Sequence, residues 1–251
     1  MWVFHLKNVK NMIKIPVFGT QTLNSFTNLK KLILSIDYPV EILSIIVNNE
    51  NINFFHDIKT FCENEIDKNF IEKVDISFHP TNLGCPSSWN YHFKSYPYAN
   101  FFIKSDDDIC LNSGDLEKMV NEIVNLNYDL VFYNNSCTKY ALFGITKHTL
   151  KKVGLFDENL YPCNYEDNDY EIRRIHYQIK TKFLELPTSH IYSGTSGNIT
   201  PEEHKKYLQK YIITTEEYYN KKWNNEFGDP MRWDYNFNYR ENKIFRFNRY
   251  Y

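Results

Sequence analysis

The segment Phe101-Phe102-Ile103-Lys104-Ser105-Asp106-Asp107-Asp108 joins three apolar residues to three consecutive carboxylates. The apolar run predicts a buried strand, and the carboxylates follow where that strand would reach the surface. Ligands of α/β sheets bind beyond the carboxyl ends of the strands, so the acidic triplet falls where a binding site is expected. Because adjacent carboxylates repel one another, a divalent cation such as Mg²⁺ or Mn²⁺ would stabilise the cluster. A solvated loop after a strand is the alternative explanation of the triplet.

Strand-like and helix-like segments alternate through the first half of the chain. Apolar runs that end in polar or turn residues predict strands over residues 13–18, 42–47, 74–78, 101–103 and 130–133. Apolar residues at helical spacing predict helices over residues 24–35, 54–66, 86–93 and 113–126. This alternation predicts an α/β fold with a mostly parallel central sheet and helices on both faces. The second half is less regular, with strands expected over 140–145 and 182–186 and helices over 149–153 and 166–177.

The chain shows no internal repeat and no linker that would divide it. We therefore expect one main domain over residues 1–200 and a helical and aromatic extension over 201–251 that packs on it. The small polar residues of 193–198 are typical of a mobile lid, and helices are expected to start near 200 and 214. For the aromatic tail from Trp223, packing on the domain, an acceptor groove and a homodimer contact are the alternatives.

The 251 residues carry a formal net charge of −2 and are 42% hydrophobic. Such a chain has enough apolar residues for a sizeable core. Its nearly neutral charge argues against broad nucleic-acid binding, which needs a dense cationic face. Asn, Lys, Ile, Phe and Tyr are abundant and all have A/T-rich codons, which is consistent with a gene from an A/T-rich microbe or a large DNA virus.

The cysteines, at positions 62, 85, 110, 137 and 163, are odd in number and widely spaced. No Cys-x-x-Cys pair and no Cys/His zinc pattern occurs, so we expect reduced thiols in a cytoplasmic protein. No apolar stretch has the length and continuity of a membrane span, and charged residues interrupt the N-terminal hydrophobic run that a signal peptide would need.

Polar residues follow four of the expected strands. They are Asn48-Asn49, the Asn82-to-Gly84 turn, the acidic triplet and His190. Carboxyl ends of parallel strands meet at one edge of a sheet, so we expect these groups to converge there. Polar turn residues commonly follow strands, so each of these turns taken alone is weak evidence for a site. The convergence is what predicts a site.

A second acidic group, Glu166-Asp167-Asn168-Asp169, opens an expected helix. Such residues often only complement the helix dipole, but a carboxylate away from a metal can also act as a general base. His190 is either an ordinary surface or core histidine or a ligand, in which case its imidazole would favour Mn²⁺ over Mg²⁺. The phosphate-binding loops of nucleotide hydrolases and dinucleotide enzymes are absent.

Several segments together resemble glycosyltransferase family 2. The turn 35–41 resembles the helix-to-strand turn of that family, and Asn82-Leu83-Gly84 with Ser88-Trp89-Asn90 resembles its Asn-Gly and Trp-Asn motif. The acidic triplet resembles its Asp-x-Asp motif. Gly154-Leu155-Phe156-Asp157-Glu158, followed by the 165–170 segment and Arg173, is very similar to its "G-x-F-D-E … E-D-x-D … R" signature. The likeness covers roughly residues 13 to 200 and also includes His190.

The resemblance implies a GT-A fold and inverting, metal-dependent transfer of a sugar from a nucleotide diphosphate donor. It implies Asp167 as the catalytic base, with Glu166 as the substitute. It implies donor contacts and metal ligands as follows: Asn48, Asn49, Asn82, Gly84, Asn90, Asp106 and Asp107 for the nucleotide sugar, and Asp106, Asp108 and His190 for Mn²⁺ or Mg²⁺. One departure is that Asn48-Asn49 stands where the family often has an Asp that reads the base, so the nucleotide stays open among UDP, GDP and dTDP.

Two other functions remain open on the same residues. One is a non-catalytic module that binds a nucleotide sugar or a glycan. The other is a metal-dependent phosphohydrolase or nucleotidyltransferase built on the acidic triplet. Neither explains the 154–173 segment, and the transferase accounts for more of the chain. Its partners would be a nucleotide sugar and a glycan acceptor, with no nucleic acid and no membrane span.

Overall fold

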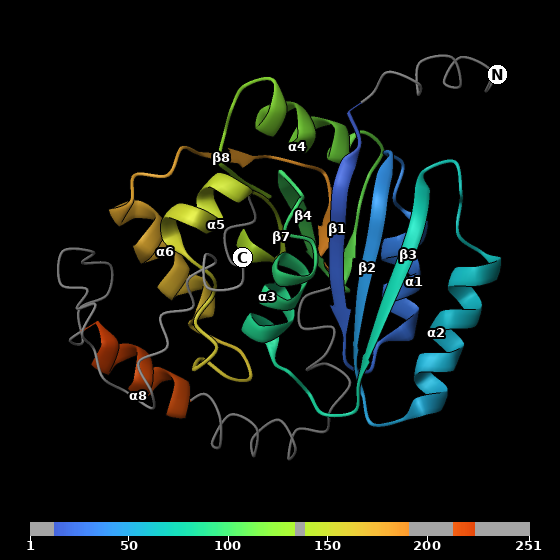
Figure 1. Ribbon diagram of the computed structural model, residues 1–251, viewed down its shortest axis with the longest axis horizontal. Coiled ribbons are helices and arrows are strands. Elements are labelled where there is room, and N and C mark those ends of the chain that lie inside the picture. Colours follow the sequence, from blue (N-terminus) through green and yellow to red (C-terminus); the bar gives the residue numbers. More distant parts are fainter. Residues whose placement is uncertain (1–12, 134–138, 191–212, 224–251) are drawn as a thin grey trace.

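The structure, a computed structural model, describes residues 13–133, 139–190 and 213–223 (Figure 1). Its centre is a seven-stranded sheet with the order β3-β2-β1-β4-β7-β6-β8. The strands are β1 (Ile15–Thr22), β2 (Val40–Asn48), β3 (Ile71–His79), β4 (Phe101–Asp106), β6 (Leu130–Tyr133), β7 (Leu142–Thr146) and β8 (Thr181–Leu184). The helices are α1 (Phe26–Leu34), α2 (Ile52–Asn64), α3 (Cys85–Ser95), α4 (Asp115–Val124), α5 (Lys147–Val153), α6 (Glu166–His176) and α8 (Ile213–Lys222).

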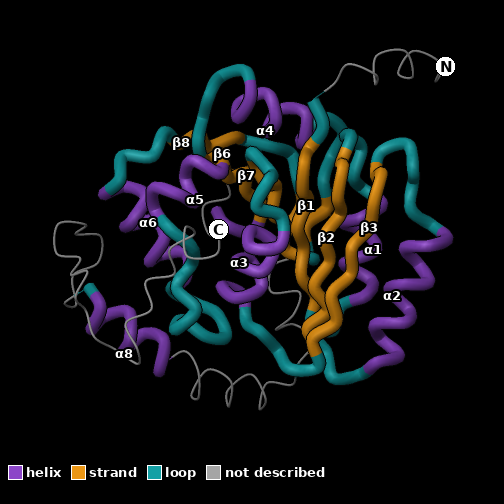
Figure 2. The backbone as a smooth tube through the Cα atoms, in the orientation of Figure 1, coloured by secondary structure: helices purple, strands orange, loops and turns teal. Residues whose placement is uncertain are grey.

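The sheet is mostly parallel, as the sequence predicts. The four strands from β3 to β4 are all parallel, and β1, β2 and β3 run side by side in Figure 2. Only β7 runs against its neighbours, β4 and β6. The connection from Tyr133 to Leu142 is too short for the helical crossover that a parallel pair needs, which explains this reversal.

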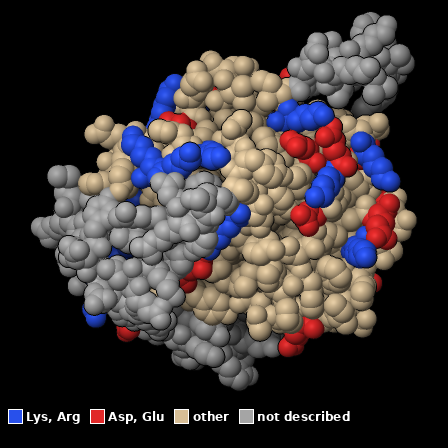
Figure 3. Space-filling model, in the orientation of Figure 1, with Lys and Arg blue, Asp and Glu red and all other residues tan. Residues whose placement is uncertain are grey.

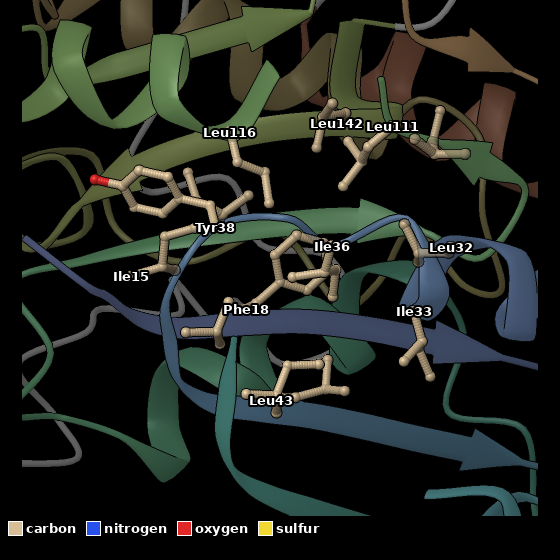
Figure 4. Packing of buried hydrophobic residues seen from close by; sticks show 14 of the residues in the cluster. Ile15, Phe18, Leu32, Ile33, Ile36, Tyr38, Leu43, Leu111, Leu116 and Leu142 are labelled. Atoms are coloured by element: carbon tan, nitrogen blue, oxygen red, sulfur yellow. The ribbon is translucent and has the colours of Figure 1, made fainter. Parts of the chain in front are cut away.

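Two apolar layers enclose the sheet because successive strand residues point to opposite faces. In β4, Phe101 and Ile103 face the layer covered by α1, α2 and α4, part of which is shown in Figure 4. Phe102, between them, faces the layer under α3, α5 and α6. β4 is therefore buried on both sides, and its buried path ends at the acidic triplet.

The structure moves the ends of several expected elements. β1 continues to Thr22 instead of ending at Phe18, because backbone pairing with β2 extends to the Thr22–Val47 pair through residues without an apolar pattern. The strand expected over 140–145 is shifted to β7, since Lys139–Ala141 form a 3-10 turn. A short second sheet, which the sequence did not predict, pairs β5 (Ile109–Cys110) with β9 (Ser189–His190).

α8 belongs to the expected C-terminal extension. Tyr218 and Tyr219 of α8, and Trp223 directly after it, form a buried cluster with Leu160 and Ile172. The expected lid over 193–198, the helix start near 200 and the tail beyond Trp223 lie outside the described residues. None of the helices within the described ranges has the length and apolar character needed to cross a membrane.

Candidate active site

The acidic triplet lies at the carboxyl edge of the sheet, where the strand order reverses between β1 and β4. β2 and β3 lie on one side of β1, and β4 lies on the other side. Such a switch point is where ligands of open α/β sheets bind. β2 and β1 are parallel to β4, so Asn48 and the triplet lie at the same edge, which is the lower edge of the sheet in Figure 1. The expected convergence is confirmed for these strands.

Asp106 is neutralised by groups of the protein itself. Its Oδ1 accepts a hydrogen bond of 2.9 Å from Gln21 Nε2 and also forms an ion pair with Lys104. The Lys104 side chain is only 1% exposed, and its ammonium lies 4.3 Å from the ring centroid of Trp89. A buried cation needs a nearby anion, and Asp106 supplies it. Asp106 is therefore held by Lys104 and Gln21 whether or not a metal binds.

Asp107 is a buried carboxyl with a raised pKa. Burial raises its pKa to about 7, a contact with the Thr22 hydroxyl opposes this shift, and the charges of Asp108 and Asp106 add to it. Asp107 Oδ2 is buried without a hydrogen-bond partner among the described residues. A buried carboxyl oxygen without a hydrogen-bond partner is suited to a ligand that donates a hydrogen bond or carries positive charge.

Asp108 and His190 are brought together by the β5–β9 ladder, which pairs Ile109 with His190. His190 Nε2 lies 3.2 Å from Asp108 Oδ1, and this hydrogen bond raises the pKa of His190. Two ligands on adjacent corners of an octahedral ion stand about 3 Å apart, so the pair fits a shared Mn²⁺ or Mg²⁺. No group of three His, Cys, Asp or Glu residues that would hold a metal occurs in the described parts of the chain. A two-ligand site fits ions that take their remaining ligands from water and substrate phosphates.

The start of α6 carries the second acidic group, and its first residue, Glu166, interacts electrostatically with Asp106. Burial raises the pKa of Glu166 well above its usual range, and the charges of Asp167, Cys163 and Asp106 contribute to the shift. Glu166 Oε2 has no hydrogen-bond partner among the described residues. Asp167, one residue further, is partly exposed, and its Oδ1 accepts a hydrogen bond of 2.8 Å from the Asn168 backbone N–H. One buried and one accessible carboxyl thus occupy the first turn of α6.

The asparagines expected to bind the donor make contacts within the protein. Asn48 donates to Ser88 Oγ and accepts from the Leu83 N–H, so it holds the β3–α3 turn against β2. Asn49 donates to the Leu23 carbonyl oxygen, and Asn82 accepts from the Gly84 N–H. These contacts shape the rim of the site, and direct contact with the donor remains a prediction for Asn48, Asn49 and Asn82.

Asn90 is fully buried. Its amide nitrogen donates to the Phe156 carbonyl oxygen and to Glu158, and its Oδ1 accepts from the Phe156 N–H. These bonds fasten α3 to the Gly154–Glu158 segment. Gly84, at the start of α3, has a φ of +79°, and a Cβ there would lie 2.7 Å from the Pro162 carbonyl oxygen. Both residues fix the approach of α3 to the loop before α6, which is a positioning role that the sequence did not predict.

Sequence reasoning missed four residues at or near the site: Gln21, Thr22, Lys104 and Lys222. Gln21 and Thr22 end β1, and polar residues after an apolar strand were a signal that pointed to them. Lys104 interrupts the apolar run directly before the triplet, where a lysine is unexpected unless paired. Lys222 gives no local signal, because its partners, Asp157 and Asp169, lie more than 50 positions away in the sequence.

The sheet order and the position of the acidic edge define an α/β GT-A fold, and solved structures of similar shape agree with this assignment. They include S. aureus TarS, with a TM-score of 0.54 and 17% identity over 69% of this chain and 35% of that one. TarS 1–349 in complex with UDP-GlcNAc gives a TM-score of 0.55 and 14% identity over 80% and 66% of the two chains. TarS 1–349 in complex with UDP gives 0.52 and 14% over 69% and 58%. The chain thus spans between about a third and two thirds of these structures. The sequence matches no protein-family model and no curated protein.

Proposed function

We propose that the chain is an inverting glycosyltransferase of the family 2 type. It would move a hexosyl or deoxyhexosyl group from a UDP-, GDP- or dTDP-sugar to a hydroxyl of a glycan or glycoconjugate. The GT-A fold supports this reading, and similar structures of TarS were solved with UDP-GlcNAc and with UDP. The observation that carries the proposal is that acidic residues of two separate elements, β4 and α6, interact electrostatically. Asp106 of β4 lies close enough to Glu166 of α6 to influence its pKa.

Asp108 and His190 would hold the divalent cation, for which Mn²⁺ suits the nitrogen ligand best. When bound, such an ion stabilises the negative charge that develops on the departing diphosphate. Asp106, held by Lys104 and Gln21, would contact the ribose or the sugar through its remaining oxygen. The buried Lys104 ammonium keeps the net negative charge of the triplet lower than three carboxylates alone would give, which favours an anionic donor.

Asp167 would take the proton from the attacking acceptor hydroxyl. A general base must be ionised before the reaction and reachable by the acceptor. Asp167 is partly exposed, whereas the raised pKa of Glu166 keeps that carboxyl protonated over a wider pH range. Glu166 would therefore donate a hydrogen bond in the site, and it stays the substitute base. Attack from the face opposite the leaving group inverts the anomeric carbon.

A thermal-shift screen of UDP-, GDP- and dTDP-sugars, with and without Mn²⁺, tests donor binding. A ligand that binds only the folded chain raises the melting temperature with its concentration. We expect one nucleotide class to stabilise the protein, and more so with Mn²⁺. Release of nucleoside diphosphate on adding an acceptor supports the transferase. Release of inorganic phosphate would instead indicate a phosphohydrolase, and donor binding without turnover on any acceptor would indicate a binding module.

A further inference from the structure

Two cysteines that the proposed reaction does not use are in contact beside the start of α6. Cys85 is the first residue of α3, and its backbone N–H donates a hydrogen bond of 2.6 Å to the Pro162 carbonyl oxygen. The Cys163 side chain also interacts with the Cys85 thiol and raises its pKa. Neither residue is in a disulfide, and both are partly exposed.

The backbone geometry places this pair within reach of a disulfide. The Pro162 carbonyl belongs to the peptide unit that leads into Cys163, so standard bond lengths limit the distance between the Cys85 and Cys163 Cα atoms to about 7 Å. Disulfides span Cα separations of roughly 4.4 to 6.8 Å. The backbone separation therefore falls within the range that a disulfide can bridge. The close approach of Gly84 to Pro162 keeps the start of α3 next to the loop that contains Cys163.

We propose that Cys85 and Cys163 form a redox modification site in which a peroxide or a low-molecular-weight disulfide converts the two thiols into a reversible disulfide. With hydrogen peroxide, the Cys163 sulfur attacks the O–O bond, giving a sulfenic acid and releasing water. The Cys85 sulfur then displaces the sulfenic oxygen, forming the S–S bond and releasing a second water. In total two electrons pass from the sulfurs to the peroxide, and both thiol protons leave in water.

The environment assigns the order of these steps. The hydrogen bond with Cys163, together with burial and nearby negative charge, raises the pKa of Cys85 well above its usual range. The thiolate is the reactive form, so Cys85 is a poor first nucleophile and acts as the resolving thiol. Cys163, whose sulfur accepts a hydrogen bond of 3.4 Å from Asn164 Nδ2, is therefore assigned the first attack.

The disulfide would affect the proposed site because Cys163 lies three residues before Glu166 and contributes to the shifted pKa of that carboxyl. Linking Cys163 to α3 fixes the loop that leads into the first turn of α6. We expect oxidation to reduce sugar transfer at least tenfold and reduction to restore it. This effect on turnover rests on the proposed function, whereas formation of the disulfide does not.

Peptide mapping of the full chain tests the proposal independently of activity. The protein is treated with a few equivalents of hydrogen peroxide, free thiols are blocked, and peptides are compared by mass spectrometry with and without reductant. The expected result is a linked peptide pair containing Cys85 and Cys163, lost in both Cys85→Ser and Cys163→Ser. Cys110→Ser, which removes another partly exposed thiol, should leave the linked pair in place.

Absence of the Cys85–Cys163 linkage while both thiols are modified separately would overturn the proposal. If the linkage forms but sugar transfer is unchanged, the site does not control the reaction. If the wild type transfers no sugar even when reduced, the proposed function fails while the mapping result still decides the disulfide.

Discussion

The Lys222 ammonium nitrogen lies 2.8 Å from Asp157 Oδ2, which joins the C-terminal part of the chain to the Gly154–Glu158 segment. The same nitrogen lies 2.5 Å from Asp169 Oδ1. Both carboxylates are buried, and Asp169 also pairs with Arg173. Two acids of the signature that indicated the function therefore anchor α8 instead of lining the site. Their neighbours, Glu166 and Asp167, are left as the candidates for chemistry.

Replacing Lys222 by Met should destabilise the protein strongly. Removing one partner of a buried ion pair leaves the other charges uncompensated, and we expect a loss of about 3 kcal/mol in the free energy of unfolding. Lys222→Arg, which keeps the charge, should lose less. Lys221→Met on the exposed face of the same helix is the matched control and should change stability by under about 0.5 kcal/mol. Equal urea midpoints for the Lys222→Met and Lys221→Met variants would contradict the anchoring role.

Asp157 should make stability depend on pH in the acid range. Burial acts to raise its pKa, but the ion pair and hydrogen bond with Lys222 outweigh burial and lower it to about 2. A carboxyl whose pKa is lower in the folded state stabilises the fold above about pH 4, and this contribution is lost as pH falls towards 2. The difference in unfolding free energy between wild type and Asp157→Asn should therefore shrink by about 2 kcal/mol over that window. A difference that is constant from pH 5 to pH 2 would rule out this linkage, and the exposed Asp57→Asn is the control.

Asp108 and His190 should control metal affinity. Removing either ligand of a two-ligand site, as in Asp108→Asn or His190→Gln, should weaken Mn²⁺ binding at least tenfold in calorimetric titrations with UDP present. Asp57→Asn on α2 changes the same charge far from the site and should leave the affinity unchanged. Wild-type Mn²⁺ affinity in both site variants would remove the metal assignment.

Lys104 should favour the anionic donor through its charge. Lys104→Met removes a buried cation next to Asp106, so the site becomes more negative, and we expect the dissociation constant of the nucleotide sugar to rise about tenfold. Lys14→Met lowers the net charge equally, but Lys14 is exposed and pairs with Glu72 near the start of β1 and β3, away from the acidic edge. Figure 3 shows such acidic and basic side chains interspersed on the surface. Equal donor affinities in the Lys104 and Lys14 variants would show that the buried charge has no such role.

The order of strands and helices was predictable from the sequence because each element carries its own apolar period. The strand at Leu130–Tyr133 was predicted with the bounds that the structure has, and the acidic triplet was placed correctly at the end of a buried strand. Strand ends without an apolar pattern were missed. Gln21 and Thr22 belong to β1 only because their backbone pairs with β2 and β4.

The contacts of the site depend on tertiary structure and were harder to predict. The resemblance implied a donor contact for Asn90, which stays a prediction, whereas the bond from its amide to Phe156, 66 positions away, had no signal in the sequence. His190 was expected in a loop after a strand and lies instead in β9, where pairing with β5 brings it to Asp108. No local pattern encodes such pairings, since they depend on which segments meet after folding.

Sugar transfer by Asp167→Asn and Glu166→Gln, measured beside donor binding, tests the central claim most directly. Loss of the general base should lower the turnover rate of Asp167→Asn by a factor of about 10² to 10⁴ while donor affinity and the melting temperature stay close to those of the wild type. Glu166→Gln, which can still donate a hydrogen bond, should retain more activity. Transfer by Asp167→Asn at the wild-type rate would contradict the assignment of a carboxylate base at the start of α6.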